Sequence, residues 1–200
     1  MDIARIQAAL AGRAFEAVVI GASAGGVGAL LQLLPGLPAG YGRAVVAVLH
    51  IPEGRQSQLA QVFQQRMRLP VHEAQDKQAV SSGTLYFAGS GYHLSVEHDR
   101  SFSLSCEAPL HFARPAIDYL MESAADVYGP ALVGILLTGA NHDGAAGMAA
   151  IGAAGGLTVV QSPQEAEVPT MPLEAIRLRT PDLILSLDEV QKLLMMLENN

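Results

Sequence analysis

The sequence predicts an α/β domain built on a doubly wound, mostly parallel β-sheet that carries an added β-hairpin. Apolar runs of strand length alternate along the 200 residues with segments of helical spacing, which is the pattern of βαβ units. The runs are continuously apolar, as in strands that are covered on both faces. No linker, charge block or repeat divides the chain. We therefore expect one Rossmann-like domain over residues 1–200, with three layers (α/β/α) and a core at about residues 15–197.

The elements follow from these patterns in chain order. An apolar run at Ala17–Ile20 predicts the first strand, and a glycine-rich turn leads from it to helical spacing at Val27–Leu34. The β-branched run Ala44–Leu49 predicts the second strand, and the polar segment Gln56–Arg68 predicts a helix. In the second half, strands are expected at Ala131–Leu137, Leu157–Gln161 and Leu183–Ser186, and helices at Ala145–Ala154 and Asp188–Leu197.

The middle of the chain breaks this alternation of strands and helices. A strand is expected at Thr84–Ala88. The segments His93–Glu97 and Phe102–Cys106 flank a polar turn at residues 98–101, which predicts an antiparallel hairpin. Ligands of doubly wound sheets bind beyond the carboxyl ends of the strands. The residues that follow the parallel strands are therefore the candidates for function.

Composition excludes several classes of protein. Lys and Arg number 12 and Asp and Glu number 19, so the net charge is −7, which argues against a nucleic-acid partner because phosphates require a basic face. Half of the residues are hydrophobic, which excludes a disordered chain. Cys106 is the single cysteine. No intramolecular disulfide can form, and we expect a reducing, cytoplasmic compartment.

Charges are absent from residues 17–42, 127–142 and 144–164. The first and third stretches are long enough to raise the question of a membrane span. The first, however, is interrupted by glycine and proline, the third is mostly Ala and Gly, and the chain has no tryptophan for an interfacial belt. We therefore expect these stretches to form buried strand units and predict no membrane insertion.

A G-x-S-x-G pattern at residues 21–25 lies between the first strand and a helix, which is the context of a nucleophile elbow. Small neighbours permit a tight turn that presents the Ser23 hydroxyl, and the helix N-terminus offers N–H groups to an oxyanion. The alternative is a glycine loop that holds a dinucleotide pyrophosphate. That alternative predicts an acidic residue at the end of the second strand, where this chain has His50. The pattern therefore favours a nucleophile.

His50 and Asp143 follow two further strands. Consecutive strands of such a sheet are usually neighbours, so Ser23 and His50 are expected within hydrogen-bond reach, with His50 as the general base. Asp143 opens the next helix and is expected to cap it, to orient His50, or to do both. His142 is the second candidate for the base, after His50, because neighbouring residues in a turn, such as His142 and Asp143, rarely point their side chains at each other. The chain order Ser–His–Asp differs from the Ser–Asp–His order of α/β-hydrolases.

No metal site and no cofactor are predicted. The remaining histidines do not have the spacing of metal ligands; they are His72, His93, His98 and His111.

Five segments resemble the chemotaxis protein-glutamate methylesterases, with their CheB-type catalytic domain. They are AVVIGASAGGVGALL (17–31), VLHIPEG (48–54), ARPAIDYLMESAADVYG (113–129), LLTGANHDG (136–144) and MPLEAI (171–176). The resemblance extends from about Phe15 to Leu197. Three catalytic motifs in the family's order make it far more specific than one G-x-S-x-G pattern.

The resemblance implies a serine hydrolase. Ser23 is then the nucleophile, His50 the base and Asp143 the orienting acid, and a backbone N–H of Ala140 donates to the oxyanion. The adjoining motif residues Ala24 and Arg114 are expected to border the substrate. The implied reaction removes γ-methyl esters from glutamyl side chains on the cytoplasmic helical domain of chemoreceptor-like proteins and releases methanol. Deamidation of receptor glutamines is implied as a further activity, and no cofactor is required.

The chain also departs from the family pattern. It has Ala24 for Thr, Leu49 for Gln, Ala140–Asn141 for Met-Gly and Ala116 for Ser. The changes at Ala24, Leu49 and Ala140 motivate the alternative of a non-catalytic signalling module that keeps the fold and docks receptor-like helices. A nucleotide-binding domain is a third hypothesis, which rests on the glycine loop. Typical members carry an N-terminal receiver domain, whereas about sixteen residues precede the first strand here. We therefore expect no receiver domain, which leaves a separate response-regulator receiver open as a partner.

Overall fold

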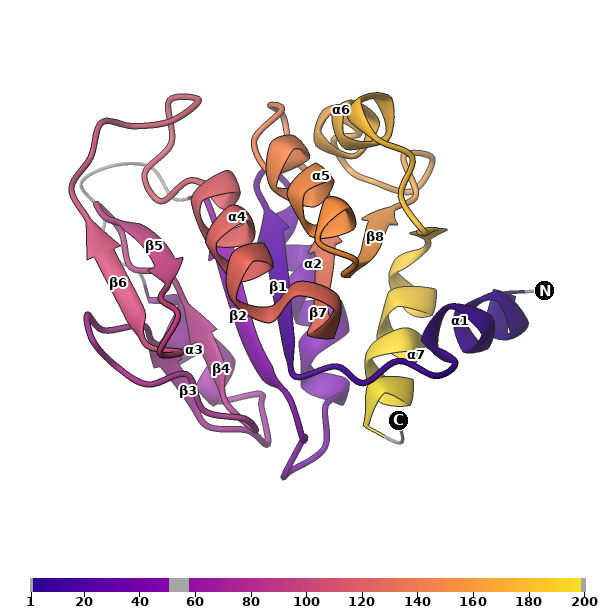
Figure 1. Ribbon diagram of the computed structural model, residues 1–200, viewed down its shortest axis with the longest axis horizontal. Coiled ribbons are helices and arrows are strands. Elements are labelled where there is room, and N and C mark those ends of the chain that lie inside the picture. Colours follow the sequence, from indigo (N-terminus) through magenta and orange to yellow (C-terminus); the bar gives the residue numbers. More distant parts are fainter. Residues whose placement is uncertain (1, 51–57, 199–200) are drawn as a thin grey trace.

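The computed structural model describes residues 2–50 and 58–198, and its main sheet has the expected doubly wound form (Figure 1). Within those residues, the sheet has seven strands in the order β3-β4-β2-β1-β7-β8-β9, and neighbours pair in parallel. The strands are β1 (Ala17–Ala22), β2 (Ala44–Leu49), β3 (Val71–Glu73), β4 (Leu85–Phe87), β7 (Leu132–Leu136), β8 (Leu157–Gln161) and β9 (Leu183–Leu185). Because β2 and β7 lie on opposite sides of β1, a topological switch point falls at the centre of the sheet.

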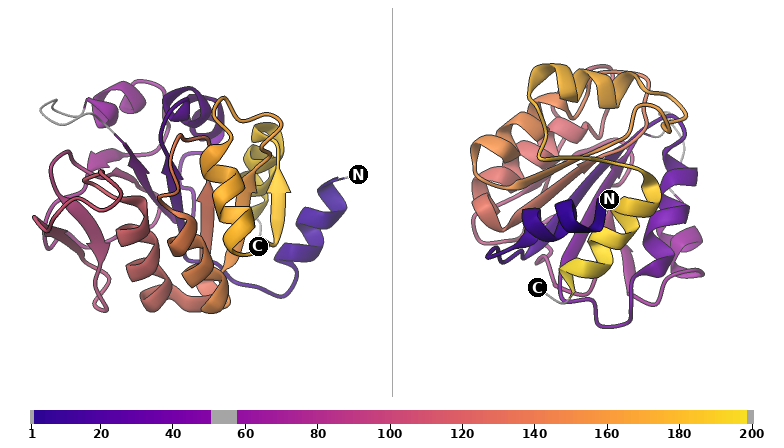
Figure 2. Two further views of the ribbon diagram at one scale, coloured as in Figure 1. Left: turned by 90° about the horizontal axis from the view of Figure 1, so that it is seen from above. Right: turned by 90° about the vertical axis from the view of Figure 1, so that its right-hand side faces the viewer.

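Helices cover both faces of the sheet (Figures 1 and 2). One face carries α4 (Ile117–Tyr128), α5 (Ala145–Ala153) and α6 (Thr170–Leu178), and the other carries α2 (Gly26–Leu33), α3 (Leu59–Gln64) and α7 (Leu187–Leu197). The helix α1 (Asp2–Leu10) packs beside α7, and the short 3-10 turns η1 (Leu34–Gly36) and η2 (Gly129–Ala131) lead into later segments. The predicted three-layer arrangement is confirmed.

The side chains of β1 show why the central strands are continuously apolar. All six residues of the strand are buried. Val18 and Ile20 pack with residues of α2 and α7, whereas Ala17 and Val19 pack with residues of α4. The charge-free stretch at residues 17–42 therefore belongs to the core of the sheet. In the part of the chain that the structure describes, no helix has the length and apolar character needed to cross a bilayer.

The predicted hairpin is confirmed and lies on the α4 side of the sheet. It consists of β5 (His93–Val96) and β6 (Phe102–Ser105), which pair antiparallel. Leu94, Val96 and Phe102 are buried in the same core cluster as α4. Cys106 follows the hairpin and is exposed. The hairpin thus packs against α4 and covers part of its apolar surface.

Several elements differ from the sequence prediction. The helix expected at Gln56–Arg68 is shorter in the described residues, where α3 ends at Gln64; residues 56–57 lie outside them. The Gln64 side chain accepts a hydrogen bond from the Val71 amide at 2.8 Å and donates to the Leu69 carbonyl at 3.3 Å, so it closes the turn into β3. The strand β3 and the helices α1, α4 and α6 were not among the elements expected from local pattern. β3, α1 and α6 are short, and such elements depend on tertiary contacts that local patterns do not reveal.

Candidate active site

Ser23 lies in the turn between β1 and α2, as the G-x-S-x-G pattern predicts. The turn reaches a left-handed conformation at Gly25, with φ of 78°, which glycine adopts without steric cost. The Ser23 amide donates to the Thr138 carbonyl at 2.9 Å, and the Thr138 hydroxyl donates to the Ala24 carbonyl at 2.8 Å. The turn that presents Ser23 is therefore fixed to the carboxyl end of β7.

His50 follows β2 and lies between Ser23 and Asp143. Its amide donates to the Ala22 carbonyl at 3.2 Å, which extends the contact between β1 and β2 by one residue. The ring nitrogen Nδ1 lies 3.2 Å from Ser23 Oγ, and Nε2 lies 2.7 Å from Asp143 Oδ2. Since an ionised carboxylate only accepts, Nε2 carries the proton and Nδ1 is free to accept the serine proton. The structure thus brings the three predicted residues into one hydrogen-bonded chain.

Asp143 is fully buried, and amides of another helix hold its carboxylate. Oδ2 accepts from the Ile117 amide at 2.7 Å, and Oδ1 accepts from the Asp118 amide at 3.0 Å. Asp143 therefore caps α4. The expectation that it caps the next helix was wrong, because α5 begins after Gly144 and has no side-chain cap. Asp143 thus caps a helix and contacts the His50 ring, but the helix that it caps is α4 and not the one that follows it in the chain.

These contacts favour the ionised form of Asp143. Burial by itself opposes ionisation of the carboxyl group. The hydrogen bonds from His50 and from the Ile117 and Asp118 amides outweigh burial, so the pKa of Asp143 lies below its ordinary value. The positive end of the α4 dipole acts in the same direction. Asp143 is therefore an anion when it contacts the His50 ring.

The arrangement predicts a severe loss of activity for Asp143→Asn. The amide side chain has one acceptor oxygen, which cannot serve both helix amides and the His50 Nε2–H. Its NH2 group then faces a donor, and His50 no longer presents a lone pair to Ser23. We expect the rate of ester hydrolysis to fall by about 10⁴-fold with the fold retained. A variant that keeps more than one tenth of the wild-type rate would contradict this role of Asp143.

A second buried carboxylate, Asp118, lies beside the first. Its Oδ1 accepts from the Gly147 amide at 2.7 Å, and its Oδ2 lies 3.3 Å from His111 Nε2. Burial, reinforced by the charge of Asp143, raises the pKa of Asp118 to about 6. The two neighbouring carboxyl groups therefore differ in their readiness to ionise, and Asp143 is the one that is anionic throughout the neutral range.

The raised pKa of Asp118 predicts a pH-dependent cost to stability. Between about pH 4 and pH 6, the unfolded chain releases this proton while the folded chain keeps it. Asp118 therefore lowers the free energy of unfolding as the pH rises, by up to about 1.4 kcal/mol per pH unit, and the cost levels off above about pH 6. Urea unfolding of wild type and Asp118→Asn should show a difference that grows across this window. A difference that is constant with pH would refute the assignment.

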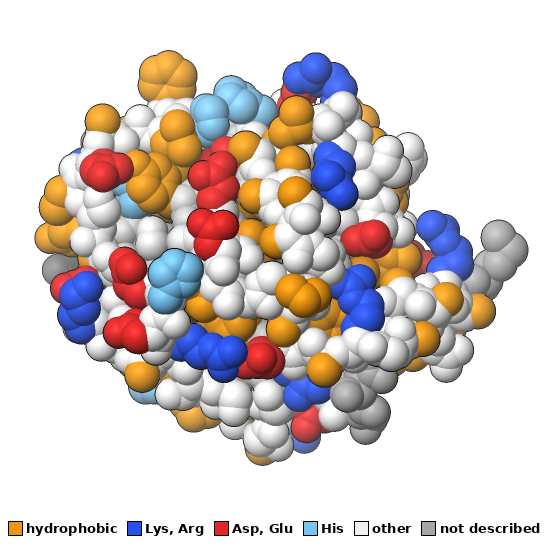
Figure 3. All heavy atoms as spheres, viewed as in Figure 1, with side chains coloured by type: hydrophobic (Ala, Val, Ile, Leu, Met, Phe, Trp, Pro, Cys, Tyr) orange, Lys and Arg blue, Asp and Glu red, His pale blue; other side chains and the backbone are white. Residues whose placement is uncertain are grey.

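His142 lies apart from the hydrogen-bonded chain. It is exposed, and its ring packs against His111 at a centroid distance of 4.1 Å. Figure 3 shows histidine side chains together at the upper edge of the molecule, where the parallel strands end in Figure 1. The structure thus places His50, rather than His142, against Ser23.

The loop after β7 comes close to Ser23. A Cβ atom on Gly139 would lie 3.0 Å from Ser23 Cβ and 2.4 Å from Met171 Cε, so a larger residue here would displace Met171 and crowd Ser23. The Gly139 carbonyl accepts from the Met171 amide at 2.9 Å, and in a trans peptide this turns the Ala140 N–H to the opposite side. Among the described residues, the Ala140 and Ala24 amides have no acceptor. Both are available to a ligand beside Ser23.

Arg114 does not point its guanidinium into open space. Its Nη1 donates to the carbonyls of Cys106 at 3.1 Å and Glu107 at 3.0 Å. The side chain thus fastens the start of the loop that connects β6 to α4. Its expected contact with a substrate stays a prediction.

The environment of Gly25 disfavours the nucleotide-binding hypothesis. A Cβ atom on Gly25 would lie 2.8 Å from Oε2 of Glu167. A phosphate at the N-terminus of α2 would therefore meet a carboxylate, in addition to finding Ser23 engaged with His50.

Within the described residues, one group of side chains could bring three metal-ligand atoms together. It consists of His111, Asp118 and Asp143, whose atoms lie within 4.8 Å of one another. Both oxygens of Asp143 already accept hydrogen bonds from backbone amides or His50. A cation here would have to displace those donors, so the residues fit a hydrogen-bonded carboxylate pair better than a metal centre.

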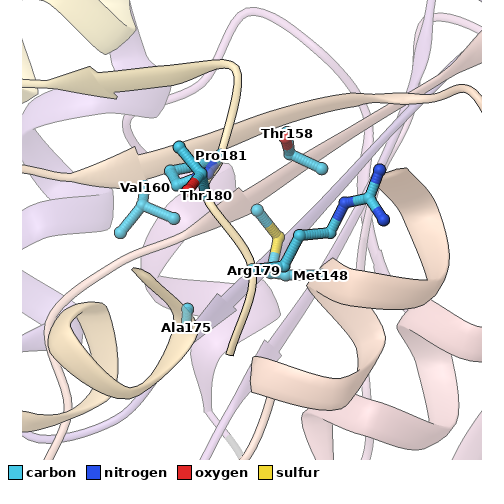
Figure 4. A pocket seen from close by; sticks show the side chains of 7 residues that line it. All are labelled: Met148, Thr158, Val160, Ala175, Arg179, Thr180 and Pro181. Carbon is cyan, nitrogen blue, oxygen red and sulfur yellow. The ribbon is translucent and has the colours of Figure 1, made fainter. Parts of the chain in front are cut away.

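Two of the cavities in the described part of the chain lie away from Ser23, His50 and Asp143. One, beside Arg179, has a volume of only about 10 Å³, too little for an organic ligand. Figure 4 shows the Arg179 side chain extending past Met148 toward α5, where Nη2 donates to the Gly152 carbonyl at 3.2 Å. The other, an open depression of about 380 Å³, is lined by Ala60, Gln61, Gln64, Gln65 and Val71. Neither contains a nucleophile and base in contact.

Sequence reasoning missed the groups that hold Asp143. These are the amides of Ile117 and Asp118 at the start of α4. The preceding amide, of Ala116, donates to His93 at 3.2 Å. Sequence alone indicates only that the first amides of any helix need acceptors from elsewhere. The identity of those acceptors depends on the tertiary fold.

A parallel α/β sheet that holds Ser, His and Asp in hydrogen-bonded order at its carboxyl ends is typical of a serine hydrolase. The comparisons with known proteins agree with that class. Residues 18–194 match the family model described as CheB methylesterase. The chain belongs to the CheB methylesterase family.

Individual relatives support this assignment. A relative from Leptospira interrogans is 41% identical over 93% of this chain and 96% of its own length. The protein-glutamate methylesterase/protein-glutamine glutaminase of Symbiobacterium thermophilum is 38% identical over 80% of this chain, which spans 44% of that relative. The crystal structure of the Thermotoga maritima CheB methylesterase catalytic domain has a TM-score of 0.85 and 29% identity, covering 92% of this chain and 99% of that one.

Proposed function

We propose that the protein hydrolyses γ-methyl esters of glutamyl side chains on chemoreceptor-like proteins, with Ser23, His50 and Asp143 as its catalytic residues. The family assignment supports the reaction class. The observation that carries the roles is the chain of contacts from Ser23 Oγ through the His50 ring to Asp143. Deamidation of glutamine side chains is part of the proposal, since relatives are named for both activities.

The first half of the proposed reaction forms an acyl-enzyme. His50 Nδ1 takes the proton of Ser23 Oγ as that oxygen attacks the ester carbonyl carbon. The Ala140 and Ala24 amides donate to the resulting oxyanion at the N-terminus of α2. His50 then returns the proton to the departing methoxide, which leaves as methanol. Asp143 holds the ring and stabilises the imidazolium between these transfers.

The second half restores the free carboxylate. Water attacks the acyl-enzyme while His50 takes one of its protons, and the acyl oxygen again receives the Ala140 and Ala24 donors. Collapse of the tetrahedral intermediate returns the proton to Ser23 and releases a glutamate side chain. With a glutamine substrate, ammonia takes the place of methanol as the leaving group.

Exposed apolar side chains near the site suit a macromolecular substrate. Phe112 is fully exposed and adjoins His111, which contacts Asp118. Leu173 is half-exposed on α6, two residues after Met171, the residue closest to Gly139. These groups support a protein surface, here the cytoplasmic helical domain of a receptor, as the proposed substrate. Regulation by a separate response-regulator receiver stays a prediction of the family resemblance.

The test is a panel of methylated receptor fragments that contain glutamyl methyl esters and glutamines at known positions. Mass spectrometry after incubation should show conversion of the esters to acids and, more slowly, of the amides to acids. The non-catalytic alternative predicts no conversion and no labelling of Ser23 by a fluorophosphonate. Labelling without conversion of any fragment would retain the serine hydrolase but refute the proposed substrate.

A further inference from the structure

Side chains from other segments accept hydrogen bonds from three successive amides at the start of α4. Its N-cap residue, Ala116, has no side chain that can cap the helix. The Ala116 amide donates to His93 Nδ1 at 3.2 Å, and the next two amides, of Ile117 and Asp118, donate to Asp143. His93 and Asp143 therefore hold successive amides of one helical turn. The amide bound by His93 directly precedes, in the chain, the amide bound by Asp143 Oδ2.

The surroundings of His93 define a single protonation state. The residue lies on β5 with 0% of its surface exposed. Its Nε2 lies 3.1 Å from the Ala108 carbonyl, which can only accept, and its Nδ1 faces the Ala116 N–H, which can only donate. The ring must therefore be neutral with its proton on Nε2. Stacking on the Tyr119 ring, at a centroid distance of 3.9 Å and an angle of 13°, fixes its plane.

We infer that His93 is a positioning residue for Asp143. Through Ala108 and Ala116 it joins the two ends of the loop at residues 108–116, which carries His111 and Arg114. Through the Ala116 amide it fixes the first turn of α4 against the carboxylate. This inference rests on the proposed function only in that Asp143 is taken to orient His50. It assigns a role to a residue that does not contact the substrate or the reacting atoms.

Three substitutions separate the contacts of His93. In His93→Asn, the side-chain oxygen can take the place of Nδ1 and accept from Ala116. In His93→Gln, the amide reaches the place of Nε2 and keeps the contact with Ala108. In His93→Phe, the ring can still stack on Tyr119 but makes neither hydrogen bond. The exposed His98, in the turn of the same hairpin, provides matched controls in His98→Asn and His98→Phe.

The rate at which a fluorophosphonate labels Ser23 measures the effect without a receptor. We expect the labelling rate to fall from wild type through His93→Asn and His93→Gln to His93→Phe. The loss for His93→Phe should be about 10²-fold, because small displacements of catalytic groups have effects of this size. The His98 variants should label at the wild-type rate. In proton NMR, the low-field resonance of the proton between His50 and Asp143 should weaken in the same order, which a loss of stability alone would not produce.

A measurement on the unmodified protein complements the variants. Nitrogen NMR of the histidine rings should show His93 neutral, with its proton on Nε2. A proton on Nδ1 would overturn the inference, as would His93→Phe labelling at the wild-type rate with an unchanged low-field resonance. If His93→Phe does not fold, the labelling rates of the other two variants decide. Faster labelling of His93→Asn than of His93→Gln supports the inference, and the reverse overturns it. Failure of every receptor fragment in the ester assay would refute the proposed substrate and leave this result standing.

Discussion

Ser23→Ala is expected to lower the rate of ester hydrolysis on the order of 10⁶-fold, the loss typical of removing the nucleophile from a serine triad. The substitution deletes the oxygen that lies 3.2 Å from His50 Nδ1 and leaves the backbone of the turn intact. The hydrogen bond from the backbone N–H of residue 23 to the Thr138 carbonyl does not depend on the side chain. Hydrolysis of a methylated receptor fragment and labelling by a fluorophosphonate should both fall to the background rate.

A matched serine controls for the substitution itself. Ser103 lies on β6 of the hairpin, away from β1, so Ser103→Ala should keep the wild-type rate. Circular dichroism and the unfolding midpoint should show that both variants are folded. If Ser23→Ala hydrolysed the ester at even a hundredth of the wild-type rate, another residue would have to be the nucleophile.

His50→Ala is expected to cause a loss of similar size, because the base and the nucleophile of a triad act as a unit. Without the ring, Ser23 has no proton acceptor and Asp143 faces an unfilled space. His142→Ala should change the rate only slightly, since its ring contacts His111 and not Ser23. The measurement is the rate of ester hydrolysis for both variants under the same conditions. The opposite ranking of the two variants would make His142 the base.

Local pattern was sufficient to predict much of the fold. The predicted strands Ala44–Leu49 and Leu157–Gln161 have the observed bounds of β2 and β8, because continuously apolar, β-branched runs have few alternatives to a buried parallel strand. The helix α1 could not be predicted in this way. It has nine residues and is stabilised by burial of Ile6 and Leu10 in the core beside α7, which no local pattern reports.

The candidate site also contains contacts that the sequence predicts and contacts that depend on the tertiary fold. Ser23 and His50 come together because they follow neighbouring parallel strands, a relation that the order of elements already implies. The support of Asp143 by α4 is a contact between segments 25 and 26 residues apart, and nothing in the spacing of Asp143 distinguishes a cap on α4 from a cap on α5. The role inferred for His93 is even harder to predict from the sequence, since His93 acts on Asp143 only through the amide of Ala116.

Methanol release from receptor membranes that carry labelled glutamyl methyl esters tests the central proposal most directly. The purified protein should release the label as methanol, and Ser23→Ala should release none above background. No release by wild-type protein whose Ser23 reacts with a fluorophosphonate would contradict the proposed substrate. Equal release by wild type and Ser23→Ala would contradict the proposed mechanism.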